Sequence, residues 1–261
     1  MFSIRSVCST LCALFGMLPL TDAPAMDEVL NLLPGSRADR VLMYNPDAVA
    51  WWIWEKYRPL FDPAMKTDPL VLRMESVMPS VTPVCFASVY SGLMPAEHGI
   101  RSYTKPVLTV DTIFDALIAK GLKPAICSTG TDSISLIFKN REMDYFIFDT
   151  PDEVNAKAAE LIRADRHDLI VAYNGNYDTV MHGHGPQAEE SLAALSHNAA
   201  SFLSLCRTAG EAWADKRWAA AFATDHGCHT LPDGRGTHGS DLEEDMNVVH
   251  LWTTGERVRG I

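Results

Sequence analysis

The side chains most able to do chemistry in this sequence are carboxylates and imidazoles that follow apolar runs. Asp225 and His226 come after the run at residues 218–222, and Gly227 follows them. This order is typical of a strand that ends in a metal-binding loop. An Asp-x-x-x-His pair follows a second apolar run, an aspartate follows a third, and another histidine lies twelve residues beyond the Asp-His pair. The six candidate metal donors are Asp47, Asp178, His182, Asp225, His226 and His238.

These donors predict a site for two metal ions. Carboxylates that lie close together repel one another by several kcal/mol unless cations neutralise them. Asp178 and His182 are four residues apart, about one helical turn, so both can face one ion. Six donors are too many for one tetrahedral zinc ion, but they suit two ions that each keep an open position for catalysis.

A two-metal site needs a nucleophile, and Thr82 is the candidate. Thr82 and Pro83 predict a helix start, with threonine at the N-cap and proline at the first helical position, and Gly92 predicts its end. Free backbone N–H groups at a helix N-terminus favour an anionic oxygen or a phosphoryl group. A bound cation would also lower the pKa of the threonine hydroxyl. The alternative is that Thr82 only caps its helix, and three other residues are rival nucleophiles: Ser80, Cys85 and Ser88.

The elements that must position these residues alternate regularly between strands and helices. Buried strands are expected at residues 40–44, 70–74, 124–127, 145–148, 168–173, 218–223 and 248–252. Helices are expected at residues 48–61, 82–92, 111–120, 132–140, 152–164 and 187–209. This alternation predicts an α/β fold, a doubly wound and mostly parallel sheet with helices on both faces. Ligands of such folds gather beyond the carboxyl ends of the strands, where the candidate aspartates lie.

Nothing in the composition divides the chain into separate domains. The sequence has no repeat, low-complexity tract or Pro/Gly/Ser linker, so we expect one domain over residues 1–261, with residues 1–39 as a helical extension packed on the core. The formal charge of −11 opposes binding to nucleic-acid polymers or to anionic membranes. A phosphate-bearing substrate would therefore depend on local positive charge, supplied most simply by metal ions.

The cysteines and the N-terminus bear on the cellular compartment. The six cysteines form no CxxC pair and no regular framework, which favours a reducing compartment and a cytoplasmic location. Residues 1–20 have apolar side chains at helical spacing and polar ones on the other side, which indicates an amphipathic helix of the mature protein. The alternative is a signal peptide cleaved near Ala23-Pro24-Ala25, which would make the protein an exported one.

Four motifs in order along the chain resemble the type I phosphodiesterase/nucleotide pyrophosphatase branch of the alkaline phosphatase superfamily. They are Asn45-Pro46-Asp47, the nucleophile segment from Pro79-Ser80-Val81-Thr82 to Pro95-Ala96-Glu97-His98-Gly99-Ile100, the segment Asp178 to Pro186, and Thr224-Asp225-His226-Gly227. The resemblance covers roughly residues 40–250 and implies that fold.

The resemblance also implies a division of the donors between two ions, most simply zinc, with manganese as the alternative. One ion would be held by Asp178, His182 and His238. The other would be surrounded by Asp47, Thr82, Asp225 and His226. Thr82 would attack phosphorus to form a covalent phospho-threonine, which water then cleaves.

Departures from the family pattern leave the substrate open. Cys85 stands where that branch has an asparagine that donates to the phosphate, so Asn174 or Asn176 are candidate substitutes, and His184 could touch substrate. Lys105, Arg101 and Arg235 are candidate phosphate contacts. The chain is shorter than typical members and shows no cap domain. The expected partner is a small phosphate ester, either a phosphodiester or a nucleotide pyrophosphate. The alternatives are a phosphomonoesterase, a phosphonate hydrolase, a phosphomutase and a silent metal-binding protein, and the oligomeric state is left unknown.

Overall fold

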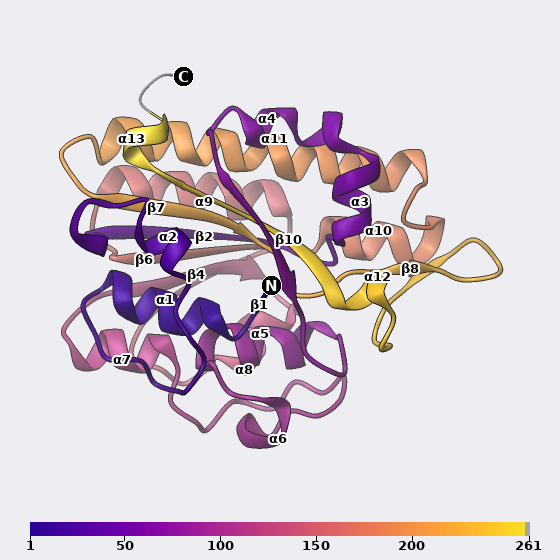
Figure 1. Cartoon of the computed structure of the whole chain (residues 1–261), viewed down its shortest axis with the longest axis horizontal. Coiled ribbons are helices and arrows are strands. Elements are labelled where there is room, and N and C mark those ends of the chain that lie inside the picture. The colour runs from indigo at the N-terminus through magenta and orange to yellow at the C-terminus, as the bar shows by residue number, and fades with distance from the viewer. Residues whose placement is uncertain (259–261) are drawn as a thin grey trace.

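The computed structural model describes residues 1–258, and its centre is one eight-stranded sheet (Figure 1). The strand order is β1-β3-β10-β7-β2-β6-β4-β5. β10 runs antiparallel to both of its neighbours, and the other pairs are parallel. The strands are β1 (Phe2–Ser3), β2 (Arg40–Pro46), β3 (Leu70–Glu75), β4 (Pro124–Thr129), β5 (Asp144–Phe148), β6 (Leu169–Asn174), β7 (Trp218–Ala223) and β10 (Asn247–Thr254). A separate hairpin joins β8 (His229–Thr230) to β9 (Gly236–Thr237).

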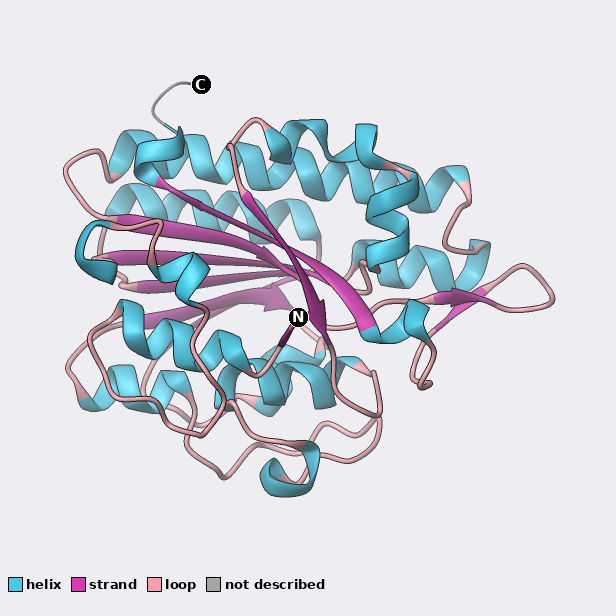
Figure 2. Cartoon of the chain, in the orientation of Figure 1, coloured by secondary structure: helices cyan, strands magenta, loops and turns pink. Residues whose placement is uncertain are grey.

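Helices cover both faces of this sheet, which confirms the predicted fold class (Figure 2). One layer contains α1 (Ser6–Leu14), α2 (Asp27–Leu30), α5 (Thr82–Ser91), α6 (Pro95–His98), α7 (Ile113–Ala119) and α8 (Ser133–Ile137). The other contains α3 (Trp51–Lys56), α4 (Asp62–Met65), α9 (Pro151–Ala164), α10 (Asn176–His184), α11 (Glu189–Ala212) and α13 (Gly255–Val258). The short elements η1 (Pro34–Ser36), η2 (Arg58–Phe61) and α12 (Glu243–Met246) lie in connections.

The central strands alternate their side chains between the two layers. In β2, Val41 and Met43 pack into the apolar cluster on the side of α1 and α5. Leu42 and Tyr44 pack into the cluster on the opposite side, with α9 and α11. Successive side chains of a strand point to opposite faces, so a strand covered on both sides must be apolar throughout. This explains why the buried strands could be found as unbroken apolar runs.

The bounds of several elements differ from the predicted ones, and two cases are instructive. The helix expected at residues 48–61 is divided into α3 and η2, and Pro59 lies in the first turn of η2. Proline has no N–H to donate and disfavours helical backbone at the residue before it, so the helix ends ahead of it. The final strand is longer than the expected 248–252, and all of β10 is buried between β3 and β7.

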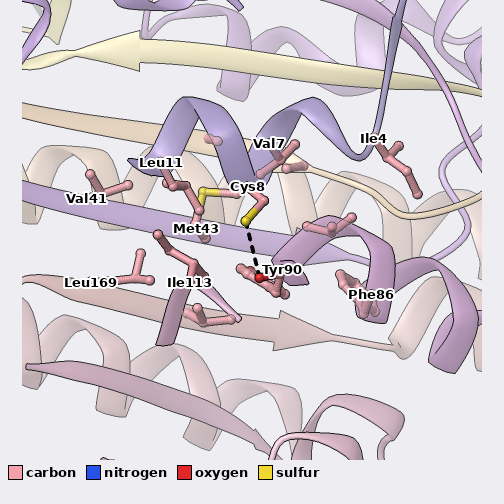
Figure 3. Packing of buried hydrophobic residues seen from close by; sticks show 14 of the residues in the cluster. Ile4, Val7, Cys8, Leu11, Val41, Met43, Phe86, Tyr90, Ile113 and Leu169 are labelled. Carbon is pink, nitrogen blue, oxygen red and sulfur yellow. Dashed lines mark hydrogen bonds between the residues drawn. The ribbon is translucent and has the colours of Figure 1, made fainter. Parts of the chain in front are cut away.

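The N-terminal segment is built into the core more fully than an amphipathic helix would be. β1 pairs with β3, and α1 packs on the layer that contains α5 and α7 (Figure 3). The polar side of α1 is buried as well, because the Thr10 hydroxyl donates to Ser6 O and accepts a hydrogen bond from Met26 N. Residues 21–33 thus cover the side that was expected to face water. No helix in the described part of the chain is both long and apolar enough to span a bilayer.

The start of α5 also differs from the prediction. Val81 is the N-cap, so Thr82 is the first helical residue and Pro83 the second. The Thr82 side chain makes no capping hydrogen bond. Gly92 ends the helix as predicted, with a φ of 75° in the left-handed region that glycine adopts without strain. The Thr82 hydroxyl is therefore free to serve another purpose.

Candidate metal centre

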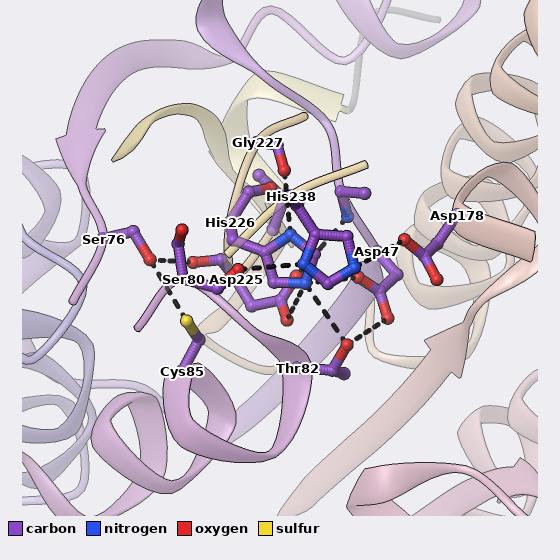
Figure 4. A network of polar contacts seen from close by, with 12 residues as sticks. Asp47, Ser76, Ser80, Thr82, Cys85, Asp178, Asp225, His226, Gly227 and His238 are labelled. Atoms are coloured by element: carbon purple, nitrogen blue, oxygen red, sulfur yellow. Dashed lines mark hydrogen bonds and ion pairs between the residues drawn. The ribbon is translucent and has the colours of Figure 1, made fainter. Parts of the chain in front are cut away.

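The six predicted donors and Thr82 lie together at the carboxyl edge of the sheet (Figure 4). Asp47 directly follows β2, and Asp225 and His226 follow its neighbour β7. Asp178 and His182 belong to α10, the helix that follows β6 on the other side of β2. The set is completed by His238, which follows β9, and Thr82, which starts α5. Parallel neighbours end at one edge of a sheet, so this fold delivers distant residues to one place.

The first donor set contains Asp178, His182 and His238. Asp178 Oδ1 lies 3.4 Å from Nε2 of each histidine. His182 Nδ1 is 3.1 Å from the carbonyl of Gly236, and His238 Nδ1 is 2.9 Å from that of Ser80. A carbonyl oxygen can only accept a hydrogen bond. The ring nitrogen that faces it must therefore be the donor, so each ring carries a proton on Nδ1.

Protonation differs between these two histidines. Burial, together with the neighbouring His226, lowers the pKa of His238 to about 3, so its ring is neutral near pH 7. Its Nε2 then presents a lone pair to the Asp178 carboxylate, and two acceptors at 3.4 Å repel unless a cation lies between them. The neighbouring carboxylate of Asp178 raises the pKa of His182. Burial acts to raise the pKa of Asp178, but its histidine partners outweigh burial and lower it.

The second donor set surrounds His226. Its Nε2 lies 3.2 Å from Asp47 Oδ1 and 3.4 Å from Asp225 Oδ2, and its Nδ1 is 2.9 Å from Gly227 O. The ring of His226 stacks on that of His238 with 4.0 Å between centroids, so the two donor sets are adjacent. Asp178 also lies within reach of Asp47 and His226, which places a carboxylate between the sets.

The carboxylates of both sets have the environment of cation ligands. Three of their buried oxygens have no hydrogen-bond partner among the described residues: Asp47 Oδ1, Asp178 Oδ1 and Asp225 Oδ2. Burial raises the pKa of Asp47 to about 6, and the negative charge of Asp178 adds to this effect. Burial and the charge of Asp47 raise the pKa of Asp225 well above its usual value. Unpaired anionic oxygens this crowded are costly without a cation, so the donor sets fit divalent metal ions.

The Thr82 hydroxyl lies against the second donor set. Its Oγ1 donates to Asp47 Oδ2 at 3.2 Å and lies 3.2 Å from His226 Nε2. The side chain is nearly buried at the end of α5 that faces the donors. A hydroxyl beside a carboxylate and a candidate metal donor set has an arrangement in which it could be activated as a nucleophile.

Sequence reasoning missed Tyr173, whose hydroxyl donates a short hydrogen bond to Asp47 Oδ2. Tyr173 is in β6, in register with Asn45 of β2, two residues before Asp47. Burial and the negative charge of Asp47 raise the pKa of its phenol. A tyrosine near the end of a buried strand was the available signal, but its partner depends on the strand pairing.

A second feature not predicted from the sequence is the network that holds the loop bearing His238. The buried carboxylate of Asp245 accepts from Ser240 N at 2.9 Å and from Ser240 Oγ at 2.6 Å, and it pairs with His229 Nδ1 at 2.8 Å. Ser80 Oγ donates to the carbonyl of Ser240 at 3.0 Å. Ser80 O in turn accepts from the ring of His238, so Asp245 is linked to a candidate metal donor.

The side chains of the weaker sequence candidates make contacts that do not include the donor side chains. Cys85 Sγ is 3.2 Å from Ser76 Oγ, and Figure 4 shows the two residues on the side away from Asp178. Burial, with the charge of Asp225, raises the pKa of this thiol well above its usual value. Asn174 donates to Asn155 Oδ1 at 3.1 Å, and Asn176 accepts from the backbone N–H of Tyr177. His184 is exposed and lies 4.0 Å from Glu190. None of these contacts includes the Thr82 hydroxyl, whose partners are Asp47 and His226.

The structure also gives the contacts of the rival nucleophiles and of the basic residues that were candidates for binding phosphate. Ser88 Oγ is 3.0 Å from His98 Nε2 inside the core, and Ser80 Oγ is used by Ser240. Arg101 donates to Ala96 O, and Arg235 pairs with Asp233 in the hairpin. Lys105 differs from these arginines because it lines a cavity of about 210 Å³ together with Thr82, Asp47 and Asp178.

The fold was compared with known proteins, and only the solved structures match it. No protein-family model matches the sequence, and no curated protein matches it. Solved structures do match. Murine ectonucleotide pyrophosphatase/phosphodiesterase 5 is 17% identical with a TM-score of 0.59, an inactive variant of it in complex with AMP is 16% identical with 0.60, and the human protein is 16% identical with 0.61.

In each case the match covers 74% of this chain and 58% of the solved one, so this chain matches well under two thirds of those proteins. Identity this low shows the fold and not the activity. The chain has the fold of the nucleotide pyrophosphatases/phosphodiesterases, the alkaline phosphatase-like core that its four motifs resemble.

Proposed function

We propose that this protein is a two-metal phosphohydrolase that cleaves the phosphoester bond of a small substrate, as a phosphodiesterase-like enzyme, through a covalent intermediate on Thr82. The observation that carries the proposal is the position of Thr82 Oγ1, 3.2 Å from both Asp47 Oδ2 and His226 Nε2 at the edge of crowded metal donors. A metal site with a purely structural role would need no hydroxyl there.

Two ions, most simply zinc and alternatively manganese, fit the two donor sets. Asp178, His182 and His238 would hold one, and Asp47, Asp225 and His226 would hold the other beside Thr82. Bound divalent ions would neutralise the carboxylates, lower the pKa of the hydroxyl and stabilise the charge of the phosphoryl oxygens.

The residues of the chain then perform two displacements at phosphorus. Thr82 Oγ1 attacks while Asp47 Oδ2, its hydrogen-bond acceptor, takes up the hydroxyl proton. The new bond joins this oxygen to phosphorus as the bond to the departing alcohol breaks. The electron pair of the broken bond goes to the oxygen of that alcohol, which takes a proton from solvent water. Water then attacks the phosphoryl group on Thr82, which releases phosphate or a monoester and restores the hydroxyl.

A change of one hydroxyl tests this proposal. Thr82→Ala should keep the metal content of the wild-type protein and lower the turnover of p-nitrophenyl phosphate and bis-p-nitrophenyl phosphate by at least about a thousandfold. Thr82→Ser keeps a hydroxyl and should retain measurable turnover. Assays with added zinc or manganese and metal analysis of each protein provide both readouts. Unchanged turnover by the alanine variant would remove Thr82 as the nucleophile.

The inactive murine variant in complex with AMP carries a threonine-to-alanine change. That observation concerns the murine protein, and it supports the choice of the same substitution for this chain. The four ordered motifs and the shared fold give the proposal its second support.

A further inference from the structure

Several residues that line the cavity at Thr82 are not among the candidate metal donors. Its volume is about 210 Å³, below the roughly 300–1,000 Å³ typical of sites for drug-sized ligands. Its lining includes Asp47, Thr82 and Asp178 of the candidate site, and also Tyr103, Lys105 and Ser133. Two of its carboxylates have buried oxygens without partners, at Asp47 Oδ1 and Asp178 Oδ1, so the cavity already requires a ligand or cation.

Lys105 is the single basic side chain among the described residues that line this cavity. Its ammonium donates to Thr131 O at 2.8 Å and lies 5.3 Å from the centre of the Tyr103 ring. These contacts hold the ammonium at the lining of the cavity. They use only one of its three N–H donors, so two donors stay free. An ammonium in the lining of the cavity that also contains Thr82 is suited to the non-bridging oxygens of a phosphate group.

A second cavity of about 320 Å³ adjoins the first and shares Asp132, Gly175 and Thr179 with it. Its other lining residues include Thr129, Asp149 and Asn176, and its surface therefore offers hydroxyl, amide and carboxylate groups. The carboxylates of Asp132 and Asp149 disfavour a further anionic phosphate in this space. They are good acceptors for the hydroxyl groups of an alcohol.

The two linings also lack a platform for a nucleobase. Their aromatic members among the described residues are Tyr103 and Tyr173. Tyr173 is 4% exposed, and its hydroxyl is bonded to Asp47, so its ring is not available for stacking. A single exposed ring, which already contacts Lys105, could stack on only one face of a base.

We propose that Lys105 recognises the non-bridging phosphate oxygens and that the adjoining cavity accepts a small hydroxylated alcohol, so that the substrate is a phosphoester of a small polyol and not a nucleotide pyrophosphate. This inference rests on the proposed phosphohydrolase function and deepens it. The near cavity takes the phosphate, and the far cavity takes the substituent that a diester retains.

Two p-nitrophenyl diesters test which substituent the far cavity prefers. The bond from phosphorus to p-nitrophenol is broken in both, so only the retained substituent differs. The p-nitrophenyl diester of glycerol phosphate carries a small polyol, and that of thymidine 5′-phosphate carries a nucleoside. The polyol ester should have the higher kcat/KM by about tenfold or more. Preference for the nucleoside ester would overturn the inference and leave the proposed function intact, provided that turnover depends on Thr82.

A lysine variant tests the phosphate contact separately. Lys105→Gln should raise the inhibition constant of inorganic phosphate about tenfold, the loss expected for one charge-assisted hydrogen bond, and lower kcat/KM for both diesters. The matched control is Lys66→Gln, because Lys66 is exposed and precedes β3 at the opposite edge of the sheet. Calorimetric titration with phosphate should show the same loss of affinity without turnover. Equal phosphate affinity in the two variants would refute the role of Lys105, and absence of any ester turnover by the zinc-loaded wild-type protein would overturn both proposals.

Discussion

The Thr82 hydroxyl donates to Asp47 Oδ2 across 3.2 Å, although the two residues are 35 positions apart in the chain. The contact exists because β2 ends at the site with Asp47 directly after it, while α5 begins there with Thr82 as its first residue. Helix starts and parallel strand ends share this edge of an α/β sheet. A hydroxyl and a carboxylate therefore meet at the start of a helix, which is the chemical basis of the proposed function.

Tyr173 should act as a positioning residue for Asp47. Tyr173→Phe removes the hydroxyl that donates to Asp47 Oδ2 and leaves the ring in place. Because partners of metal ligands typically contribute 10- to 100-fold to affinity, we expect the variant to bind zinc about tenfold or more weakly in competition with a chelator. Tyr44→Phe is the control, since this buried tyrosine bonds Asn198 within the core. Equal zinc affinity in both variants would show that the Tyr173 hydroxyl does not orient the carboxylate.

Asp245 should hold the loop that carries His238. Asp245→Asn removes one charged acceptor from Ser240 and His229, so the link through Ser80 to His238 becomes less rigid. We expect about a tenfold increase in the zinc concentration needed for half-maximal activity, with full activity at excess zinc. The exposed neighbour Asp241 supplies the control variant Asp241→Asn. Activity that excess zinc does not restore would argue against a positioning role.

His250 should make the fold sensitive to acid. It is fully buried, its Nε2 lies 2.7 Å from Thr224 O, and burial lowers its pKa to about 4. The unfolded chain takes up this proton near pH 6.5 and the folded protein near pH 4, so stability is complete above pH 6.5 and falls as the pH drops through that window. The loss from this group is on the order of 3 kcal/mol.

The variant His250→Gln keeps a side-chain donor for Thr224 O and removes the titration. Urea unfolding of the metal-free proteins at pH 7 and pH 5 should show a smaller loss of unfolding free energy for the variant than for the wild type. Both proteins share the site carboxylates, so the difference between them isolates His250. Equal losses in the two proteins would contradict the assigned pKa shift.

The Asp225 carboxylate should destabilise the fold when metal is absent and stabilise it when metal is bound. Burial and the charge of Asp47 raise the pKa of Asp225, which means that its ionised form destabilises the metal-free fold near pH 7. Asp225→Asn should therefore raise the melting temperature in a chelator and lower it, relative to the wild type, in excess zinc, because a ligand bound only to the folded state stabilises it. Thermal scans of both proteins in both conditions measure this. A variant less stable than the wild type in chelator would contradict the crowding of carboxylates.

The sequence was sufficient to predict the fold class and to select candidate donors at the ends of strands, because both depend on local patterns. Strands buried on two faces, such as β2, β6 and β7, are unbroken apolar runs, and the acids and imidazoles follow them directly. The structure brings all six predicted donors together, with Thr82 beside them. Their common location follows from parallel strands that end at one edge.

The rest depends on contacts between distant segments, which local patterns do not encode. The role of Tyr173 follows from the register of β6 on β2, and that of Asp245 from the path of the loop after β7. The antiparallel position of β10 between β3 and β7 has no signature in its own apolar run. The side of α1 expected to face water is covered by residues 21–33. This packing depends on a segment outside the helix and cannot be predicted from the helix alone.

Anomalous diffraction at the zinc edge from crystals of the zinc-loaded protein tests the central claim most directly, since it locates each ion without reference to activity. We expect two peaks, one among Asp178, His182 and His238 and the other among Asp47, Asp225 and His226, within bonding distance of Thr82 Oγ1. A map with no peak at these side chains, or with ions bound only elsewhere, would contradict the two-metal site.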